Sequence, residues 1–504
     1  MKQLKGILLA AAAITICTAA YVSAADIYVD AVKGTANGNG SLGSPYQTIE
    51  QARNAVRSMN ADMKEDINVI IRGGTYFIEN TIKLSTQDSG SNGYYVNYRA
   101  YPNEEPVING AKEITGWTIY DADKNIWKAP AQGIQTRHLY INGQRAVRAK
   151  TDKTLTEIKK TDEGFLCDDE WLLDLKKPQD LEFSWVVLWT NPRCGVASIT
   201  KNAEGRVAIT MKNPGWGYFK KYRSGGQVSV TEPTWMENAY EFLDEPGEFY
   251  LDRDTDTFYY IPRDGEILEN ATVYAPVVEQ MLRIEGDNID NKVHNIRIDG
   301  LRFEYSTWNR PSTGSGHHET QCNYIVDPEG SEHRMIDAAV TLRRAENVPV
   351  ENCVISKIGN IGLKLEDGTQ YSDVTGNHIY DISGTGIALG EVIGNAVTST
   401  SWKYYCRGNN VRNNLVENVG VDYHSSVGIS AGFPMESEIS HNEIIGSNYS
   451  GMHIGYGWGN YVTTGTNMRD FKITDNIVAD TMKSCHDGGG IYTLGATGAT
   501  EKHR

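Results

Sequence analysis

The stretch from Asn347 to Gly495 repeats one pattern five times. A hydrophobic–x–x–Asn–x–hydrophobic phrase is followed, after a short break, by Gly–hydrophobic–x–hydrophobic. The second phrase reads Gly362-Leu-Lys-Leu, Gly386-Ile-Ala-Leu, Gly428-Ile-Ser-Ala, Gly451-Met-His-Ile and Gly490-Ile-Tyr-Thr. From glycine to glycine the spacing is 24, 42, 23 and 39 residues. These values indicate a base period of about 23–25 residues, with longer loops in two of the turns.

This period predicts an all-β solenoid. Each repeat contains short runs with alternating apolar residues, and none contains a segment of helix length. A fixed period built from short strands is typical of stacked coils in which each repeat contacts only its neighbours. We therefore predict a right-handed parallel β-helix.

An asparagine recurs at the same place in every repeat. Asparagine amides can stack in a ladder at a corner of the solenoid and bond the coils above and below. The five residues are Asn352, Asn377, Asn414, Asn442 and Asn476. We expect them to have a structural role.

Composition and charge narrow the range of partners. The 504-residue chain carries a net charge of −16, with 28 Tyr and 10 Trp. Without a leader containing Lys2 and Lys5 the charge is near −18. A strongly acidic chain without basic runs is a poor partner for nucleic acid or an anionic membrane. Abundant aromatic rings are typical of sugar-binding proteins. We also expect the protein to be a monomer.

Residues 1–24 resemble a secretory signal peptide, with Lys2 and Lys5, an apolar core from Gly6 to Cys17, and the small-residue site Val22-Ser-Ala24. We therefore expect a secreted protein, extracellular or periplasmic. Residue Cys17 lacks the preceding small residue of a lipoprotein site, which favours release. The six later cysteines have no paired short spacings, so they indicate neither a zinc site nor a dense disulfide framework. They leave room for one or two bridges.

Four parts follow from the pattern of strands and turns. The signal peptide precedes residues 25–111, an N-terminal cap and the first coils, where Thr48 is the expected N-cap of a helix from Ile49 to Met59. Residues 112–268 read as an inserted antiparallel β-sandwich-like domain, with a tight turn at Asn142-Gly143. Residues 269–504 form the coils with the candidate groove. No capping segment follows them, so we expect a fragment of a longer protein.

Alternation within the Gly–hydrophobic–x–hydrophobic strands points their middle residues outward. The stacked outer face contains Lys364, Ala388, Ser430, His453 and Tyr492. The loops before the glycines add Asp381, Asp422, His424, Asn448, Tyr449, His486 and Asp487, while Glu391 follows its strand. Carboxylates, imidazoles and aromatic rings along one groove suit an extended sugar chain.

The sharpest stretch is Cys485-His-Asp-Gly-Gly-Gly-Ile-Tyr-Thr-Leu-Gly495, in which three glycines permit close approach of backbone and ligand. Here Asp487 is the candidate catalytic residue. The candidate substrate-binding residues are His453, Tyr492, Tyr449, His486, His424, Asp422 and Trp308. Each also has a purely structural interpretation, such as a turn cap for Asp487 or a packed imidazole for His453.

No metal or other cofactor is predicted. The run from His317 to Glu319 resembles a metal cluster but lacks a helical partner spacing. A structural calcium ion is not indicated.

Several motifs together resemble secreted β-helix glycoside hydrolases, most closely glycoside hydrolase family 141, with family 120 related. The motifs are Gly74-Thr-Tyr76, Tyr98-Arg-Ala-Tyr-Pro, Val107-Ile-Asn-Gly-Ala111, Phe249-Tyr-Leu-Asp252, Tyr259-Tyr-Ile-Pro262, Tyr449-Ser-Gly-Met-His-Ile-Gly455 and Asp487-Gly-Gly-Gly-Ile-Tyr-Thr-Leu-Gly495. The resemblance implies hydrolysis of plant cell-wall glycans, xylan-type or fucosylated. It also implies that Asp487 is a catalytic carboxylate, with a second acidic residue on a further coil, beyond residue 504.

Glycosidases use two carboxyl groups, about 5–5.5 Å apart for retention or about 6.5–9.5 Å for inversion. Equivalent positions on adjacent coils are about 4.8 Å apart, and positions two coils apart are about twice that. Two alternatives remain open: a polysaccharide lyase, with Lys364 as base and usually calcium, and a non-catalytic glycan-binding β-helix.

Overall fold

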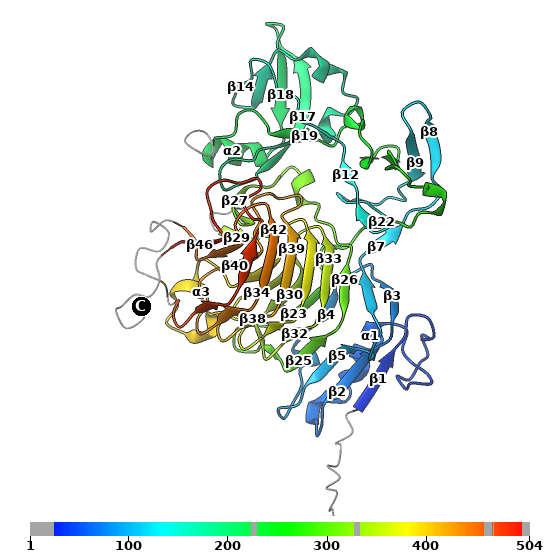
Figure 1. The fold of residues 1–504 in the computed structure, drawn as a ribbon, viewed down its shortest axis with the longest axis vertical. Coiled ribbons are helices and arrows are strands. Elements are labelled where there is room, and N and C mark those ends of the chain that lie inside the picture. Colours follow the sequence, from blue (N-terminus) through cyan, green and yellow to red (C-terminus); the bar gives the residue numbers. More distant parts are fainter. Residues whose placement is uncertain (1–24, 223–228, 327–332, 458–465, 467, 496–504) are drawn as a thin grey trace, which may run out of the picture.

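A computed structural model describes residues 25–222, 229–326, 333–457, 466 and 468–495 of the chain. Its body is a β-helix made of three parallel sheets, with an antiparallel domain on one side (Figure 1). The predicted signal peptide and residues 496–504 lie outside the described residues.

Sheet 1 has nine strands and sheets 2 and 3 have eight each. Sheet 1 contains β1 (Ala25–Val29), β2 (Ile67–Ile71), β5 (Val96–Ala100), β25 (Ile296–Asp299), β32 (Val350–Glu351), β35 (Val374–Thr375), β38 (Asn410–Arg412), β41 (Glu438–Ser440) and β44 (Lys472–Thr474). Sheet 2 contains β3 (Gly74–Phe77), β6 (Pro106–Asn109), β26 (Arg302–Glu304), β33 (Val354–Ile358), β36 (His378–Ile382), β39 (Leu415–Val419), β42 (Glu443–Ser447) and β45 (Ile477–Ala479). Sheet 3 contains β4 (Ile82–Leu84), β23 (Leu282–Glu285), β30 (Ala338–Arg343), β34 (Ile361–Glu366), β37 (Ile387–Leu389), β40 (Ile429–Ala431), β43 (Met452–Ile454) and β46 (Ile491–Thr493).

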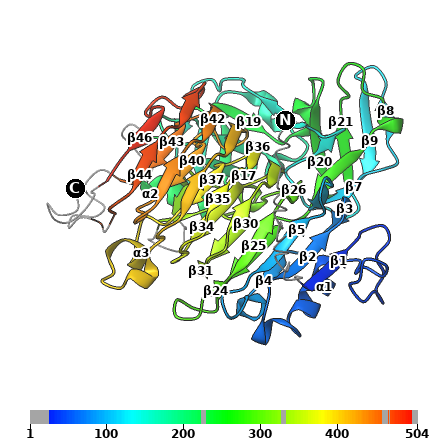
Figure 2. The same cartoon turned by 60° about the horizontal axis from the view of Figure 1, so that its bottom comes forward.

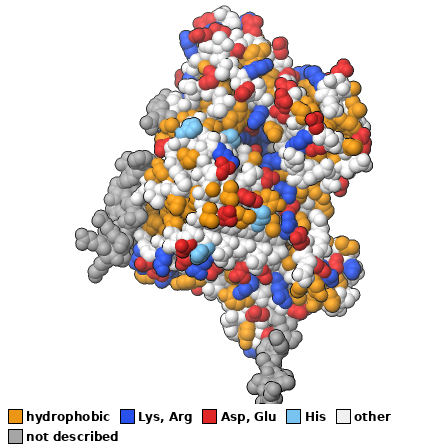
Figure 3. Space-filling view, in the orientation of Figure 1, with side chains coloured by type: hydrophobic (Ala, Val, Ile, Leu, Met, Phe, Trp, Pro, Cys, Tyr) orange, Lys and Arg blue, Asp and Glu red, His pale blue; other side chains and the backbone are white. Residues whose placement is uncertain are grey.

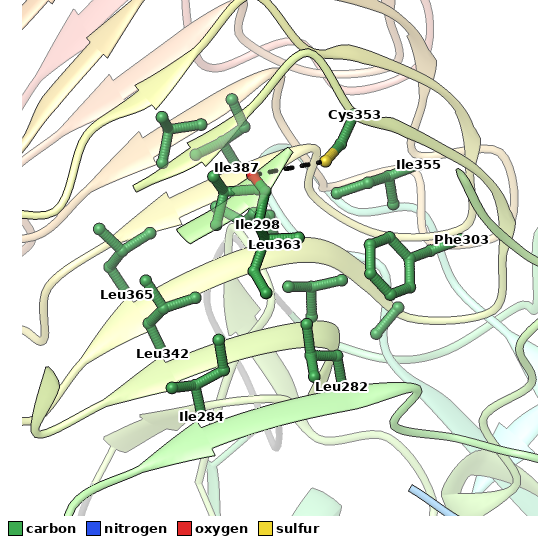
Figure 4. Close-up of a cluster of buried hydrophobic side chains, with 14 of the residues drawn as sticks. Leu282, Ile284, Ile298, Phe303, Leu342, Cys353, Ile355, Leu363, Leu365 and Ile387 are labelled. Carbon is green, nitrogen blue, oxygen red and sulfur yellow. Dashed lines mark hydrogen bonds between the residues drawn. The ribbon is translucent and has the colours of Figure 1, made fainter. Parts of the chain in front are cut away.

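Alternation along these strands produces the core. In sheet 3 the register pairs Leu363 with Ile387, which pairs with Ile429 on the next coil. All three side chains are fully buried. Figure 4 shows apolar side chains from successive coils, including Leu363, Leu365 and Leu342, meeting in the interior. Because every coil buries the same positions, the period read from the sequence is the period of the core.

The asparagine ladder is present, with one change of member. Side-chain Nδ2 atoms donate to the next Oδ1 at 2.9 Å from Asn377 to Asn414, from Asn414 to Asn442 and from Asn442 to Asn476. The prediction for Asn352 is wrong, because that residue has φ 52° and bonds Asp299. Its repeat is one residue shorter, so Cys353 takes the ladder position and donates its N–H to Asn377.

One end of the core is covered by the predicted helix. The helix α1 (Ile49–Val56) begins at Thr48, whose side chain forms a capping box with Gln51, and it ends three residues before the predicted boundary. Buried Ile49, Ala52 and Val56 face the first coils. Such a helix protects apolar surface that a bare solenoid end would expose.

An antiparallel domain interrupts the β-helix between β6 and β23, as Figure 2 shows from a second side. It contains a seven-stranded sheet, a five-stranded sheet and a four-stranded sheet. The seven strands are β13 (Lys150–Thr151), β19 (Trp235–Glu237), β16 (Glu182–Ser184), β17 (Arg193–Lys201), β18 (Val207–Met211), β15 (Gly164–Cys167) and β14 (Lys159–Lys160). The five are β12 (Val147–Arg148), β20 (Glu248–Asp252), β21 (Thr257–Tyr260), β9 (Ile126–Pro130) and β8 (Thr118–Asp121), and the four are β11 (Gln144–Arg145), β10 (Tyr140–Ile141), β22 (Val273–Pro276) and β7 (Ala111–Glu113).

The hairpin expected at Asn142-Gly143 is present, and a second hairpin lies further along the domain. Strands β10 and β11 pair across Asn142-Gly143, where both residues have positive φ, and β20 pairs with β21. The domain also contains α2 (Gly215–Tyr222). All six cysteines expected in the mature chain are buried and free, so none of the possible bridges is formed.

Candidate active site

The predicted stack on sheet 3 is present, but it is not an open groove. Lys364 pairs with Ala388, then Ser430, His453 and Tyr492 follow in register. The first four are at most 5% exposed. A covering segment lies over this face. It contains a small antiparallel sheet made of β27 (Glu319–Gln321), β28 (Tyr324–Val326) and β29 (His333–Met335). The expectation of an open groove along this face is therefore wrong. Tyr492 is the one residue of the stack that is partly exposed.

The same covering segment buries Trp308, which was expected to bind substrate. The Trp308 ring packs edge-on against His317 and Tyr423, with centroids 5.2 and 5.3 Å away. All three side chains are at most 2% exposed. Burial lowers the pKa of His317 well below its usual value. Trp308 therefore fixes the covering segment on the β-helix and does not face a ligand.

Asp487 lies beside the expected aromatic residues. The Tyr449 hydroxyl donates to the Asp487 main-chain oxygen and accepts from Gln321 Nε2 at 2.8 Å. Burial and the nearby Asp487 carboxylate raise the pKa of Tyr492. Asp487 itself is partly exposed. Its side chain is therefore within electrostatic reach of both tyrosines and does not point into the apolar interior.

The glycines after Asp487 have separate roles. A Cβ on Gly488 would collide with the Tyr449 ring and Ser450 Oγ, so only glycine permits this close approach. A Cβ on Gly489 would meet nothing closer than 3.9 Å. Gly488 therefore lets the loop pack directly on Tyr449, and Gly489 leaves open space next to its own backbone.

His453 joins this group from the preceding coil. Its ring centroid lies 5.5 Å from that of Tyr492 and 6.5 Å from that of Tyr456. Burial lowers the pKa of His453 to about 4, against a smaller opposing effect of the Gly455 main chain. The imidazole is therefore neutral at neutral pH, and it packs against the Tyr492 ring from the preceding coil.

A turn of the inserted domain binds three separate parts of this region. We call Leu188–Asn191 the bridging turn. The Leu188 carbonyl accepts the His486 N–H at 2.9 Å, and Asn191 Oδ1 accepts the His424 N–H at 3.1 Å. The Thr190 hydroxyl donates to buried Glu319 at 2.7 Å. The bridging turn therefore connects the loop before β46, the loop before β40 and the covering segment.

Asp422 and His424, both expected to bind substrate, lie where the inserted domain meets the β-helix. The Asp422 carboxylate bonds His138 Nε2 at 3.0 Å, Arg145 at 3.1 Å and the Ser383 hydroxyl at 2.5 Å. Arg145 and His138 hold the pKa of Asp422 well below its usual range. The His424 ring lies 5.1 Å from Trp235, and burial lowers the pKa of His424 to about 4.

Three arginines surround this contact, of which Arg137 and Arg193 are buried and Arg148 is nearly so. Arg137 bonds Glu182 at 2.6 Å and Glu237 at 2.9 Å, and Arg148 and Arg193 complete the network. Lys and Arg side chains are visible in the recess below the upper part of the molecule in Figure 3. The sequence contained no signal for this network, since its members are distant in the chain and follow no period.

No group of three or more His, Cys, Asp or Glu side chains in the described ranges could hold a metal ion.

Lys364, the base that a lyase would need, is 5% exposed and bonds Glu366 at 2.9 Å and the Ile336 carbonyl at 3.0 Å. A buried, paired lysine does not suit that role.

No helix of the described residues is long and apolar enough to cross a membrane.

The fold and its insertion match those of known glycoside hydrolases. Residues 124–263 match the family described as the GH141 insertion domain, which confirms the resemblance to glycoside hydrolase family 141. This match covers the inserted domain, including Arg137, Arg145 and the bridging turn.

Among solved structures, one named "Glycoside hydrolase" superimposes with a TM-score of 0.82 at 24% sequence identity, covering 94% of this chain and 86% of that one. A second, "The complex structure of XylC with xylose", matches with a TM-score of 0.46 at 13% identity, covering 90% of this chain and 62% of that one. Among curated proteins, none matches in sequence.

Proposed function

We propose that this protein is a secreted glycoside hydrolase that acts on plant cell-wall polysaccharide or its oligosaccharides, either xylan-type or fucosylated glycans. Asp487 is one member of a two-carboxyl mechanism. The observation that carries the proposal is the placement of a partly exposed Asp487 against Tyr449 and Tyr492, in a chain that has a glycoside hydrolase insertion domain.

The chemistry of such a site requires a carboxyl group that can reach the glycosidic oxygen or the anomeric carbon. Gly489, without a side chain, leaves room beside Asp487 for a sugar ring. Tyr492 supplies a partly exposed ring beside it, since aromatic rings pack on the apolar faces of sugars. The buried residues Tyr449 and His453 hold the Asp487 loop and Tyr492 in place and do not contact the sugar themselves.

Asp422 and His424 are assigned to the wall of the same site. The Asp422 carboxylate is held ionised by Arg145 and His138, and its side chain is still 31% exposed. Asp422 precedes β40 and Asp487 precedes β46, two coils apart, or roughly 10 Å along the axis. Exposed His486 continues the wall next to Asp487.

The test is Asp487→Asn, assayed on xylan-type and fucosylated oligosaccharides. Loss of an acting carboxyl group lowers turnover by a factor of about 10²–10⁴, while sugar binding is retained because the variant keeps size and hydrogen-bonding capacity. Asp480→Asn is the matched control, because Asp480 is exposed on the same coil and pairs with Lys483. Equal turnover in wild type and Asp487→Asn would remove Asp487 from the mechanism.

A product assay separates this proposal from the lyase alternative. Hydrolysis adds water across the bond and yields saturated sugars, whereas a lyase leaves an ultraviolet-absorbing double bond. We expect saturated products only. Secretion is tested by finding the mature chain, without residues 1–24, outside the cytoplasm of the producing cell.

A further inference from the structure

A second recess lies on the opposite end of the sheet 3 strands from Asp487. It has a volume of about 850 Å³ and lies among the carboxyl-terminal ends of β30, β34 and β37 and the short helix α3 (Asn395–Thr398). Its walls include Lys364, Glu366, Glu391, Arg343 and Tyr404. We call it the α3 cavity. Figure 1 shows α3 beside this end of the sheet.

Two ion pairs lie within the wall of the α3 cavity. Lys364 Nζ lies 2.9 Å from Glu366, and Arg343 lies 2.8 Å from Asp367. A cavity whose charges are already matched has little attraction for an ionic ligand. It still presents many donors and acceptors, which suit hydroxyl groups because a hydroxyl both donates and accepts.

Glu391 adds an unusual group to the wall. One carboxyl oxygen accepts the Asp367 N–H, while Oε2 is enclosed and has no hydrogen-bond partner among the described residues. Burial, and then the charges of Glu366 and Asp367, raise the pKa of Glu391 to about 8. At neutral pH this carboxyl group keeps its proton, so it adds no negative charge to the wall.

The size and the lining together favour a sugar. Ligand sites in proteins commonly measure about 300–1,000 Å³ and combine aromatic rings with a few polar groups. Tyr404, which is partly exposed, supplies the ring.

We propose that the α3 cavity binds a neutral sugar unit of a glycan, with Glu366 on its hydroxyl groups and Tyr404 against its ring. The cavity is three to five coils from the coil of Asp487, roughly 14–24 Å along the axis. It is a separate binding site and not the site of hydrolysis. The choice of a sugar as ligand rests on the proposed function, while the existence of a site for a neutral polyhydroxyl ligand does not.

The test is calorimetric titration of the full chain with xylotetraose and with 2′-fucosyllactose. Asp487→Asn serves as parent, so that the sugar is not consumed. In this parent, Tyr404→Ala and Glu366→Gln are expected to weaken one binding event about tenfold or more, the effect of losing a wall or a charged hydrogen bond. Trp402→Ala is the matched control, because Trp402 lies on the same short 3₁₀ turn but outside the cavity wall.

A pH series gives a second readout that does not depend on those variants folding well. The groups that face Glu391 are Glu366, Asp367 and Lys364 on β34 and the turn after it, Tyr324 on β28, and Cys406. Above pH 8 an ionised Glu391 adds a negative charge to the wall, next to Glu366 and Asp367. Sugar binding should therefore weaken from pH 7 to pH 9 in the parent, and much less in Glu391→Gln.

Binding that is unchanged by Tyr404→Ala and Glu366→Gln, in proteins with wild-type thermal unfolding, would overturn the proposal. So would the absence of any sugar binding. The proposed function fails differently: binding that responds to the cavity variants, with no hydrolysis by wild type, would support the cavity and contradict the glycosidase. Hydrolysis that requires Asp487 without binding in the α3 cavity would do the reverse.

Discussion

Two polar networks hold this molecule together, and they differ in kind. The asparagine ladder within the β-helix is neutral and repeats once per coil, with every link at 2.9 Å. The network between Arg137, Arg148, Arg193, Glu182 and Glu237 in the inserted domain is charged, buried and unrepeated. The ladder provides a regular platform, while the charged network and the bridging turn next to it fix the walls of the candidate site. Regularity stabilises the fold here, and irregular contacts shape the site.

The largest effect should come from breaking the charged network. Arg137→Met leaves Glu182 and Glu237, both at most 5% exposed, short of a cation. Removing one partner of a buried ion pair costs about 3–5 kcal/mol of stability. Denaturant unfolding measures this loss. Arg206→Met removes a partly exposed pair with Asp168 and should cost about 0–1 kcal/mol. Equal losses would show that the buried network is no more important than a surface pair.

Acid should weaken the fold around the site through two buried imidazoles, one in the inserted domain and one in the β-helix. Burial lowers the pKa of His138 and of His453 to about 4, against about 6.5 in the unfolded chain. Between those values the unfolded state binds more protons, so stability is complete above pH 6.5 and falls as the pH falls towards 4.

Unfolding at pH 7.5 and pH 5.5 should therefore differ by roughly 1.4 kcal/mol for each of these two histidines. His453→Gln should remove one share of that difference, whereas His441→Gln, at a side chain that is 60% exposed, should leave it unchanged. An identical pH dependence in all three proteins would contradict a buried, neutral His453.

Breaking the ladder should have a smaller effect than breaking the charged network. Asn414→Ala removes the acceptor of Asn377 N and Asn377 Nδ2, at 3.0 and 2.9 Å. Leaving buried donors unsatisfied costs about 1–3 kcal/mol. Asn395→Ala, at an exposed position on α3, should change stability by no more than about 0.5 kcal/mol. A ladder variant as stable as this control would mean that the ladder is not a stabilising element.

The smallest predicted effect concerns the bridging turn. Asn191→Ala removes the acceptor of the His424 N–H, so amide exchange should accelerate at residues 422–424, and kcat/KM should fall by up to about tenfold. Asn202→Ala disrupts an exposed turn of the same domain and should change neither quantity. Exchange that is unchanged at residues 422–424 would show that the turn does not position that wall.

The sequence predicted what repeats and missed what does not. The coils, the inward residues of sheet 3 and four of the five ladder asparagines follow from a period of local chemistry, and the helix after Thr48 follows from its cap. Asn352 was misassigned because a one-residue deletion shifts it to a corner with positive φ. The burial of Trp308 was missed because the covering segment carries no periodic signal, and the contacts of Asp422 with Arg145 and His138 join residues more than 270 positions apart. The neighbourhood of Asp487 was predicted, since adjacent coils fix it.

The most direct test of the account is a crystal structure of Asp487→Asn with a bound oligosaccharide substrate. We predict a glycosidic oxygen or an anomeric carbon within about 3–3.5 Å of the side chain at position 487, with a sugar ring against Tyr492. A substrate bound productively elsewhere, with position 487 and Tyr492 free of contacts, would contradict it.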